Sequence, residues 1–180
     1  ANHGFTLPRE LGDALTALAH QEGATLFMAL LAGFQALLQR WTGQDDITVG
    51  SPIANRHRGE LEPLIGCFIN TLVFRADLAG EPTFRELLRR VREAALGAYA
   101  NQDVPFELLV ETLQPQRDMS HAPLFQTMFI LQNIPPQAQQ LSGLRMEQVE
   151  THSDTASFDL TLIMVETPQG LRANIEYNTD

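Results

Sequence analysis

Cysteine is almost absent from this sequence, which has a single one, Cys67, among 180 residues. One cysteine excludes a disulfide within the chain and a cysteine-rich metal site. Cys67 lies inside an apolar run, so we predict that it is a small buried hydrophobic residue.

Long hydrophobic runs are also missing. No stretch approaches the roughly 18 consecutive apolar residues of a membrane-spanning helix, and no signal peptide is recognisable. We therefore expect no membrane partner and a reducing, cytoplasmic location. The hydrophobic content of 44 % nevertheless suffices, over this length, for the core of one domain or large subdomain.

Basic residues are scarce relative to acidic ones, 12 against 22, which gives a formal net charge of −10 and a pI near 4.8. Nucleic acids and anionic membranes offer no opposite charge to such a chain, so neither is an expected partner. The acidic residues are spread over predicted helix faces and loops, where solvation is their expected role.

The sequence also lacks a recognisable catalytic or metal-binding constellation. None of its five histidines has the paired spacing of a zinc site, and no glycine-rich phosphate loop is present. We therefore name no catalytic residue, no metal ligand and no residue that binds a cofactor.

What is present is a central apolar stretch from Ile65 to Arg75, reading IGCFINTLVFR. Alternate residues of a strand point to opposite faces, and both sets are apolar here, which predicts a strand covered on both faces. Asn70 is the exception. An amide buried without partners costs about 1–3 kcal/mol. We therefore expect Asn70 to make several hydrogen bonds that fix strand register or a loop, with direct contact to a substrate as the alternative.

Apolar residues at helical spacing predict four helices, at about residues 8–21, 26–41, 84–100 and 106–113. Thr25 is the expected N-cap of the second helix, and Thr83 with Glu86 forms a capping box before the third. Trp41 continues the apolar stripe of the second helix and is expected in the core.

Six stretches predict strands: residues 46–53, 65–75, 124–132, 144–150, 158–166 and 171–178. Residues 167–170 form a plausible hairpin turn between the last two. Helices alternating with strands, followed by strands alone, indicate a layered α/β or α+β unit.

Five segments in order resemble the condensation domains of non-ribosomal peptide synthetases. The central stretch is similar to the family's motif of an Ile-Gly pair, Phe-Val-Asn-Thr and a late Arg, and NQDVPFE to its Gln-Asp-x-Pro-Phe-Glu motif. RDMSHAPL resembles Arg-Asp-x-Ser-x-x-Pro-Leu, and two further segments are typical of the family. The five segments are Gly50–Arg56, Ile65–Arg75, Asn101–Glu107, Arg117–Leu124 and Phe158–Leu162.

The resemblance implies a lobe like chloramphenicol acetyltransferase, an α/β (α+β) two-layer sandwich with a mixed β-sheet packed by helices. Family members have two such lobes facing each other across a tunnel. They join a donor acyl or peptidyl thioester to the amine of an acceptor aminoacyl thioester, and both thioesters are carried on phosphopantetheine arms of carrier domains. The implied cofactors are thus arms of partner proteins, with none bound covalently to this chain.

The family's catalytic signature, His-His-x-x-x-Asp-Gly on the first lobe, is missing here. No two histidines are adjacent, and none has Asp four residues later. We therefore interpret residues 1–180 as the C-terminal lobe of a condensation domain, separated from its N-terminal lobe and inactive alone, so that its status as an enzyme by itself stays open. The expected partners are the N-terminal lobe, donor and acceptor carrier domains and neighbouring synthetase domains.

Five residues are candidates for the tunnel wall or its scaffold. Ser51 is a candidate to hydrogen-bond an amide of a pantetheine arm, or is a plain turn hydroxyl. Asn70 either fixes the scaffold or contacts a substrate. Gln102 and Asp103 precede Pro105 at a helix break, where a cap or loop anchor is expected ahead of substrate contact. Arg117 either pairs locally with Asp118 or contacts the missing lobe.

Two alternatives remain from the sequence. The chain is either half of a condensation catalyst or a non-catalytic module that docks carrier proteins, and a lobe of an epimerisation or cyclisation relative is a minor variant. A lobe without its partner exposes apolar surface, so we also expect self-association, opposed in part by the net charge.

Overall fold

The structure, a computed structural model, describes residues 1–56, 58–61, 63–115, 122–132 and 155–179. Four helices and six strands occupy these residues, with one short 3-10 helix at Gly59–Leu61. The helices are α1 (Arg9–Gln21), α2 (Leu26–Thr42), α3 (Phe84–Ala100) and α4 (Phe106–Leu113). The strands are β1 (Asn2–Pro8), β2 (Asp46–Ile53), β3 (Asn70–Asp77), β4 (Thr127–Gln132), β5 (Leu160–Thr167) and β6 (Gly170–Tyr177).

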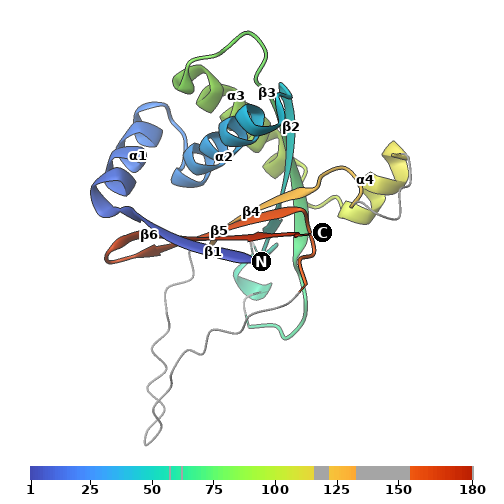
Figure 1. Cartoon of the computed structure of the whole chain (residues 1–180). Coiled ribbons are helices and arrows are strands. Elements are labelled where there is room, and N and C mark those ends of the chain that lie inside the picture. The colour runs from blue at the N-terminus through green and yellow to red at the C-terminus, as the bar shows by residue number, and fades with distance from the viewer. Residues whose placement is uncertain (57, 62, 116–121, 133–154, 180) are drawn as a thin grey trace, which may run out of the picture.

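The strands form one mixed sheet in the order β1-β6-β5-β4-β2-β3. Strand β4 is parallel to both β2 and β5, and the other neighbours are antiparallel. Helices α1, α2 and α3 lie together on one face of the sheet (Figure 1). The two-layer α/β sandwich with a mixed sheet is therefore confirmed.

The core lies between these helices and the sheet. Phe27 of α2 meets the rings of Phe74 on β3 and Phe129 on β4, with centroids 5.5 and 5.3 Å apart. Phe74 and Phe129 are almost fully enclosed, at 1 % and 0 % exposure. Gln35 of α2 is also buried, and its amide donates to the carbonyl of Phe74 at 3.1 Å.

The capping residues predicted for the starts of α2 and α3 are confirmed. The Thr25 hydroxyl accepts the Met28 N–H at 3.3 Å, and Gly43 closes α2 in the left-handed conformation at φ 71°. At α3, Thr83 and Glu86 form the reciprocal capping box. These bonds satisfy backbone groups that a helix end otherwise leaves without partners.

The prediction of one strand over Ile65–Arg75, covered on both faces, was wrong. Strand β3 begins only at Asn70 and is an edge strand, with Arg75 exposed. Ile65 is fully exposed and Cys67 is exposed, so the buried position predicted for Cys67 was also wrong. Apolar residues occur both in β3 and in the loop before it. Periodicity alone therefore does not mark where the strand begins.

Two further predictions need correction. Trp41 is 74 % exposed, because the last buried residue of α2 is Leu38 and the helix has passed the core by its final turn. Strand β1 was not predicted at all, although it pairs antiparallel with β6 along its whole length. Its residues are mostly exposed, so it shows little of the apolar pattern that identifies a strand.

The predicted strand at residues 144–150 lies outside the described residues. In the part of the chain that is described, no single helix has the length and apolarity to cross a membrane. Helices α1 and α2 have the necessary length and apolarity only when they are taken together, and the pair is bent by 105°.

Candidate functional site

Asn70, the first residue of β3, joins the sheet to the connection between α3 and α4. Its amide nitrogen donates to the carbonyls of Gln102 at 2.9 Å and Val104 at 2.8 Å. Its amide oxygen accepts the N–H groups of Thr71 at 2.9 Å and Phe106 at 3.1 Å. The side chain thus makes the several backbone hydrogen bonds expected of it, and it fixes where α4 begins.

Aromatic rings continue this junction towards the centre of the sheet. The ring of Phe106 lies 5.6 Å from that of Phe125, which lies 5.5 Å from that of Phe158. Phe125 is buried and occupies the space that a Cβ atom on Gly50 of β2 would need. Only glycine at position 50 permits this close approach of ring and strand.

The family-like segments therefore meet at one place. Gly50, Asn70, Phe106 and Phe158 belong to four of the five segments, and Phe125 follows directly on the fifth. We call these five residues the motif cluster. It joins parts of the chain that lie up to 108 positions apart, from Gly50 to Phe158 (158 minus 50).

Ser51 lies next to this cluster on β2, but its side chain is enclosed. It is 3 % exposed and pairs across the sheet with Leu72. Because neighbouring strand residues alternate in direction, Ser51 shares a face with the buried Val49, under the helices. The contact with a pantetheine arm predicted for Ser51 stays a prediction, and it requires this side chain to become accessible.

Gln102 and Asp103 lie at the helix break as expected, and the backbone of Gln102 anchors the loop through Asn70. Helix α4 starts after Pro105 without a side-chain cap, so neither residue caps it. Arg117 lies outside the described residues.

Arg56 is a site residue that sequence reasoning missed. Its guanidinium donates to the carbonyls of Leu61, of Leu64 at 2.9 Å and of Gly66 at 2.9 Å. It also lies 4.3 Å from the centroid of the Phe68 ring, a cation–π geometry. One side chain thus shapes the loop that leads into β3. The sequence signal that could have identified Arg56 is its position, shortly after a predicted strand and before a long polar loop.

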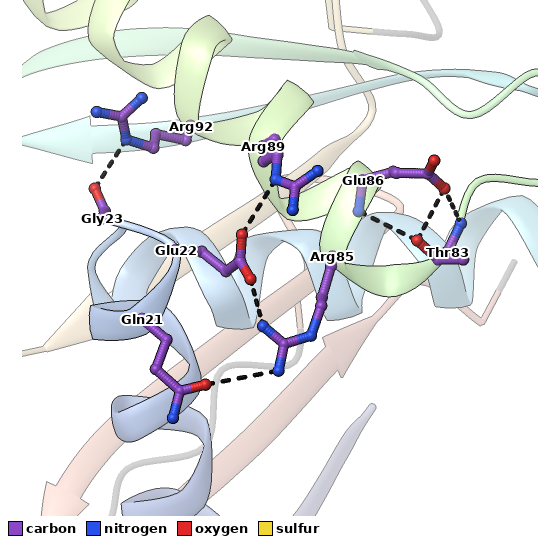
Figure 2. Close-up of polar contacts among 8 residues, drawn as sticks. All are labelled: Gln21, Glu22, Gly23, Thr83, Arg85, Glu86, Arg89 and Arg92. Atoms are coloured by element: carbon purple, nitrogen blue, oxygen red, sulfur yellow. Dashed lines mark hydrogen bonds and ion pairs between the residues drawn. The ribbon is translucent and has the colours of Figure 1, made fainter.

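A second polar cluster, away from the motif cluster, joins α1 to α3 (Figure 2). Glu22, just beyond α1, accepts hydrogen bonds from Arg85 and, at 3.1 Å, from Arg89. Arg92 donates to the carbonyl of Gly23 at 2.8 Å. The hydrogen bond from Arg85, supported by Arg89, lowers the pKa of the Glu22 carboxyl. These contacts are structural, because they hold two helices that cover the sheet.

Arg75, the late arginine of the central segment, pairs with Asp46 on the neighbouring strand. Both guanidinium–carboxylate hydrogen bonds are short, at 2.8 and 2.7 Å. The pair lowers the pKa of Asp46 and raises that of Arg75. The Asp46 and Arg75 side chains are 58 % and 74 % exposed. The ion pair therefore contributes little to the free energy of unfolding.

No three His, Cys, Asp or Glu side chains gather to hold a metal ion in the described ranges. The motif cluster consists of an amide, three rings and a glycine, which can position backbone and present an apolar wall. None of its members is a group that transfers protons near neutral pH.

The model of the condensation domain family matches residues 2–180. The chain belongs to the condensation domain family. A linear gramicidin synthase protein of Brevibacillus parabrevis is 58 % identical over 182 residues, which cover 100 % of this chain and 2 % of that protein. Bacitracin synthase 3 of Bacillus licheniformis is 46 % identical over 175 residues, which cover 97 % of this chain and 3 % of that protein. This condensation-family chain thus spans only a few per cent of these relatives.

Solved structures share this fold. The X-domain from teicoplanin biosynthesis matches with a TM-score of 0.89 and 26 % identity, over 98 % of this chain and 41 % of that chain. Holo-AB3403, a four domain nonribosomal peptide synthetase, matches with a TM-score of 0.86 and 24 % identity, over 100 % of this chain and 15 % of that one. The second likeness shows the fold alone. The resemblance predicted from the five segments is confirmed.

Proposed function

We propose that this chain is the C-terminal lobe of a condensation domain that forms peptide bonds in non-ribosomal peptide synthesis. The observation that carries the proposal is the motif cluster, in which the segments typical of the family meet at one place. In this role the lobe supplies one wall of the tunnel through which two substrates reach each other.

In the proposed reaction, the amine of an acceptor aminoacyl thioester attacks the carbonyl carbon of a donor acyl or peptidyl thioester. A C–N bond forms, the C–S bond breaks, the donor thiol leaves and the amine loses a proton. Both thioesters arrive on the phosphopantetheine arms of carrier domains. The group that orients or deprotonates the amine belongs to the histidine pair of the other lobe. Since these 180 residues contain no adjacent histidines, this chain alone is inactive.

The chain's own candidate residues then have positioning roles. Asn70 holds the start of α4 against the sheet through the four hydrogen bonds described above. Gln102 and Asp103 form the loop that Asn70 anchors, and Ser51 and Arg117 remain candidates for contact with a pantetheine arm and with the other lobe.

A second function, docking of carrier proteins without chemistry, is favoured by one feature. Val104 and Leu108 are 42 % and 50 % exposed beside the anchored loop, as in a surface that binds another protein. In this second function the chain would bind partners and would never take part in bond formation.

A hybrid protein separates the two functions. In the linear gramicidin synthase protein, the 182-residue segment that is 58 % identical to this chain is replaced by this chain. Peptide products are then followed by mass spectrometry. We expect product from the hybrid and a large loss of product when Asn70→Ala is introduced. A hybrid that folds and binds its carriers but makes no product would support the docking function and contradict the catalytic one.

A further inference from the structure

Strand β1 forms one edge of the sheet, and in the described part of the chain its only neighbouring strand is β6. Ala1 donates to the carbonyl of Tyr177 at 2.8 Å and accepts the N–H of Tyr177 at 2.9 Å. Hydrogen-bonded and non-hydrogen-bonded pairs alternate along an antiparallel ladder. The register therefore directs the backbone groups of His3, Phe5 and Leu7 towards β6.

The backbone groups of the residues between them point outward. Asn2, Gly4 and Thr6 each present one N–H and one C=O group to the free edge. This row of groups is symmetrical about Gly4. A second β1 strand lying antiparallel to the first would place Gly4 opposite its own copy and Asn2 opposite Thr6 of the second copy. Every outward donor and acceptor of these three residues would then have a partner.

The two edges of the sheet differ in how well they are protected. Strand β3, at the other edge, has exposed charges at Arg75 and Asp77 and is tied to a loop through Asn70. Charged side chains on an edge discourage another strand from pairing with it. Residues 2–8 contain no Asp, Glu, Lys or Arg, and β1 pairs with β6 without a bulge. Strand β1 is thus open to pairing with a further strand.

The side chains on and beside β1 favour a second copy as that strand. The rings of His3 and Phe5 stack at 6.2 Å on the face that packs against the core. The two-fold pairing sets His3 opposite Phe5 of the second copy, and aromatic pairs of this kind stabilise antiparallel strands. On the other face, the same rotation places Glu176 of each β6 strand in one row with Arg172 of the other copy. Opposite charges therefore share these rows.

Helix α1 leaves room for such a contact. It packs on β6, where the position of a Cβ atom on Gly12 is 3.6 Å from the Leu171 side chain. In a joined sheet the two β6 strands would be three strand spacings apart, about 14 Å. Packed helices need only about 8–10 Å between their axes. The two α1 helices can therefore lie side by side on one face.

We propose that this chain pairs with a second copy of itself through β1, so that two six-stranded sheets become one continuous sheet. The inference goes beyond the proposed function and does not depend on it. A contact made mainly by one strand is small, so the dimer is weak and forms as the concentration rises. Each copy has a net charge of −10, so added salt should strengthen the association by screening this repulsion.

Position 4 provides the test, because the two-fold rotation sets this residue opposite itself. Gly4 is exposed, and a Cβ atom there would make only ordinary contacts. Gly4→Lys and Gly4→Glu each set two like charges opposite each other and should weaken the dimer several-fold. An equal mixture of the two variants should restore it, because lysine then meets glutamate. Gly4→Thr adds a side chain without charge and is the matched control. Sedimentation equilibrium measures the mass of each sample against concentration.

Hydrogen exchange provides a second measurement. The amides of Phe5 and Leu7 are bonded to β6 and should be protected at every concentration, which also shows that a variant keeps β1 folded. The amides of Gly4 and Thr6 should exchange freely in dilute solution. They should exchange several-fold more slowly when the chain is concentrated, as for amides that a partner strand covers.

Four results would overturn the inference. The first is the monomer mass at every concentration. The second is association that Gly4→Lys leaves unchanged or that the mixture of charged variants fails to restore, which places the contact elsewhere. The third is association that weakens as salt is added, which means that ion pairs form the contact. The fourth is protection of Gly4 and Thr6 that is the same at every concentration, which means that the chain covers this edge itself.

Discussion

The amide oxygen of Asn70 accepts the backbone N–H of Phe106 at 3.1 Å, so the first residue of β3 holds the first residue of α4. The two residues are 36 positions apart in the chain. Through the same side chain the sheet edge is tied to a loop, and through the Phe106 ring to Phe125. A single amide therefore joins two of the segments by which the family is recognised.

Replacing Asn70 with alanine should release this junction. The change leaves the N–H groups of Thr71 and Phe106 and two carbonyls without their partner. Because water reaches part of this site, we expect the free energy of unfolding to fall by about 2–3 kcal/mol. Urea denaturation measures the loss, and hydrogen exchange should show α4 opening before the sheet.

Asn70→Asp is the informative comparison. Aspartate retains the two acceptor bonds but places a carboxylate beside the carbonyls of Gln102 and Val104. We expect it to be at least as destabilising as alanine near neutral pH. If Asn70→Asp proved as stable as the parent chain, the donor bonds described here would have no energetic role.

Gly50 provides a second test, through its contact with Phe125. A methyl group at position 50 would overlap the Phe125 ring, and overpacking of this kind costs about 1–3 kcal/mol. Gly33→Ala is the control, because that glycine lies exposed in α2 with nothing near its missing Cβ. Alanine there should stabilise the chain by about 0.5–1 kcal/mol. Thermal unfolding of the two variants should therefore shift in opposite directions.

The sequence predicted the helices and their caps well, but it predicted the two edge strands, β1 and β3, poorly. Helix caps such as Thr83 with Glu86 are local signals, and they were found where expected. The start of β3 was missed because Ile65 and Ile69 are apolar but exposed. Whether an apolar residue is buried depends on the elements that pack around it, and local periodicity does not reveal them. Strand β1 was missed for the opposite reason, since an exposed edge strand needs few apolar residues.

The motif cluster could be predicted only in part. Asn70 stood out as an amide in an apolar run, but three of its four partners, Gln102, Val104 and Phe106, lie 32 to 36 positions away, beyond the reach of local patterns. Arg56 was missed because its partners are backbone carbonyls, which every residue has and which no sequence pattern marks.

Arg56→Lys tests whether one guanidinium shapes the loop before β3. A lysine cannot reach three separated carbonyls and stack on Phe68 with the same planar geometry. We expect a loss of about 1 kcal/mol in unfolding free energy and several-fold faster exchange of amides in residues 63–69. Arg58→Lys, two positions on in the same loop, is the control. Equal exchange in both variants would contradict the role given to Arg56.

Glu22 predicts a pH dependence with a definite sign. Its pKa in the folded chain is lowered by the hydrogen bonds from Arg85 and Arg89, so it contributes stability that is fully present above its ordinary, unfolded pKa. That contribution is lost as the pH falls through the lower, folded pKa. Glu22→Gln should therefore be less stable than the parent chain at neutral pH, and the difference should shrink on acidification. Urea denaturation across this range measures it, with Glu93→Gln as the exposed control. A constant difference at every pH would exclude this carboxylate as the cause.

The central claim, that this chain is half of a condensation catalyst, is tested most directly by complementation. The chain is mixed with a separately expressed N-terminal lobe and with carrier domains loaded with donor and acceptor, and product is measured by mass spectrometry. The account predicts peptide from the complete mixture, none from either lobe alone, and none when both histidines of the added lobe are replaced by alanine. Peptide formed by this chain and the loaded carriers without the N-terminal lobe would contradict it.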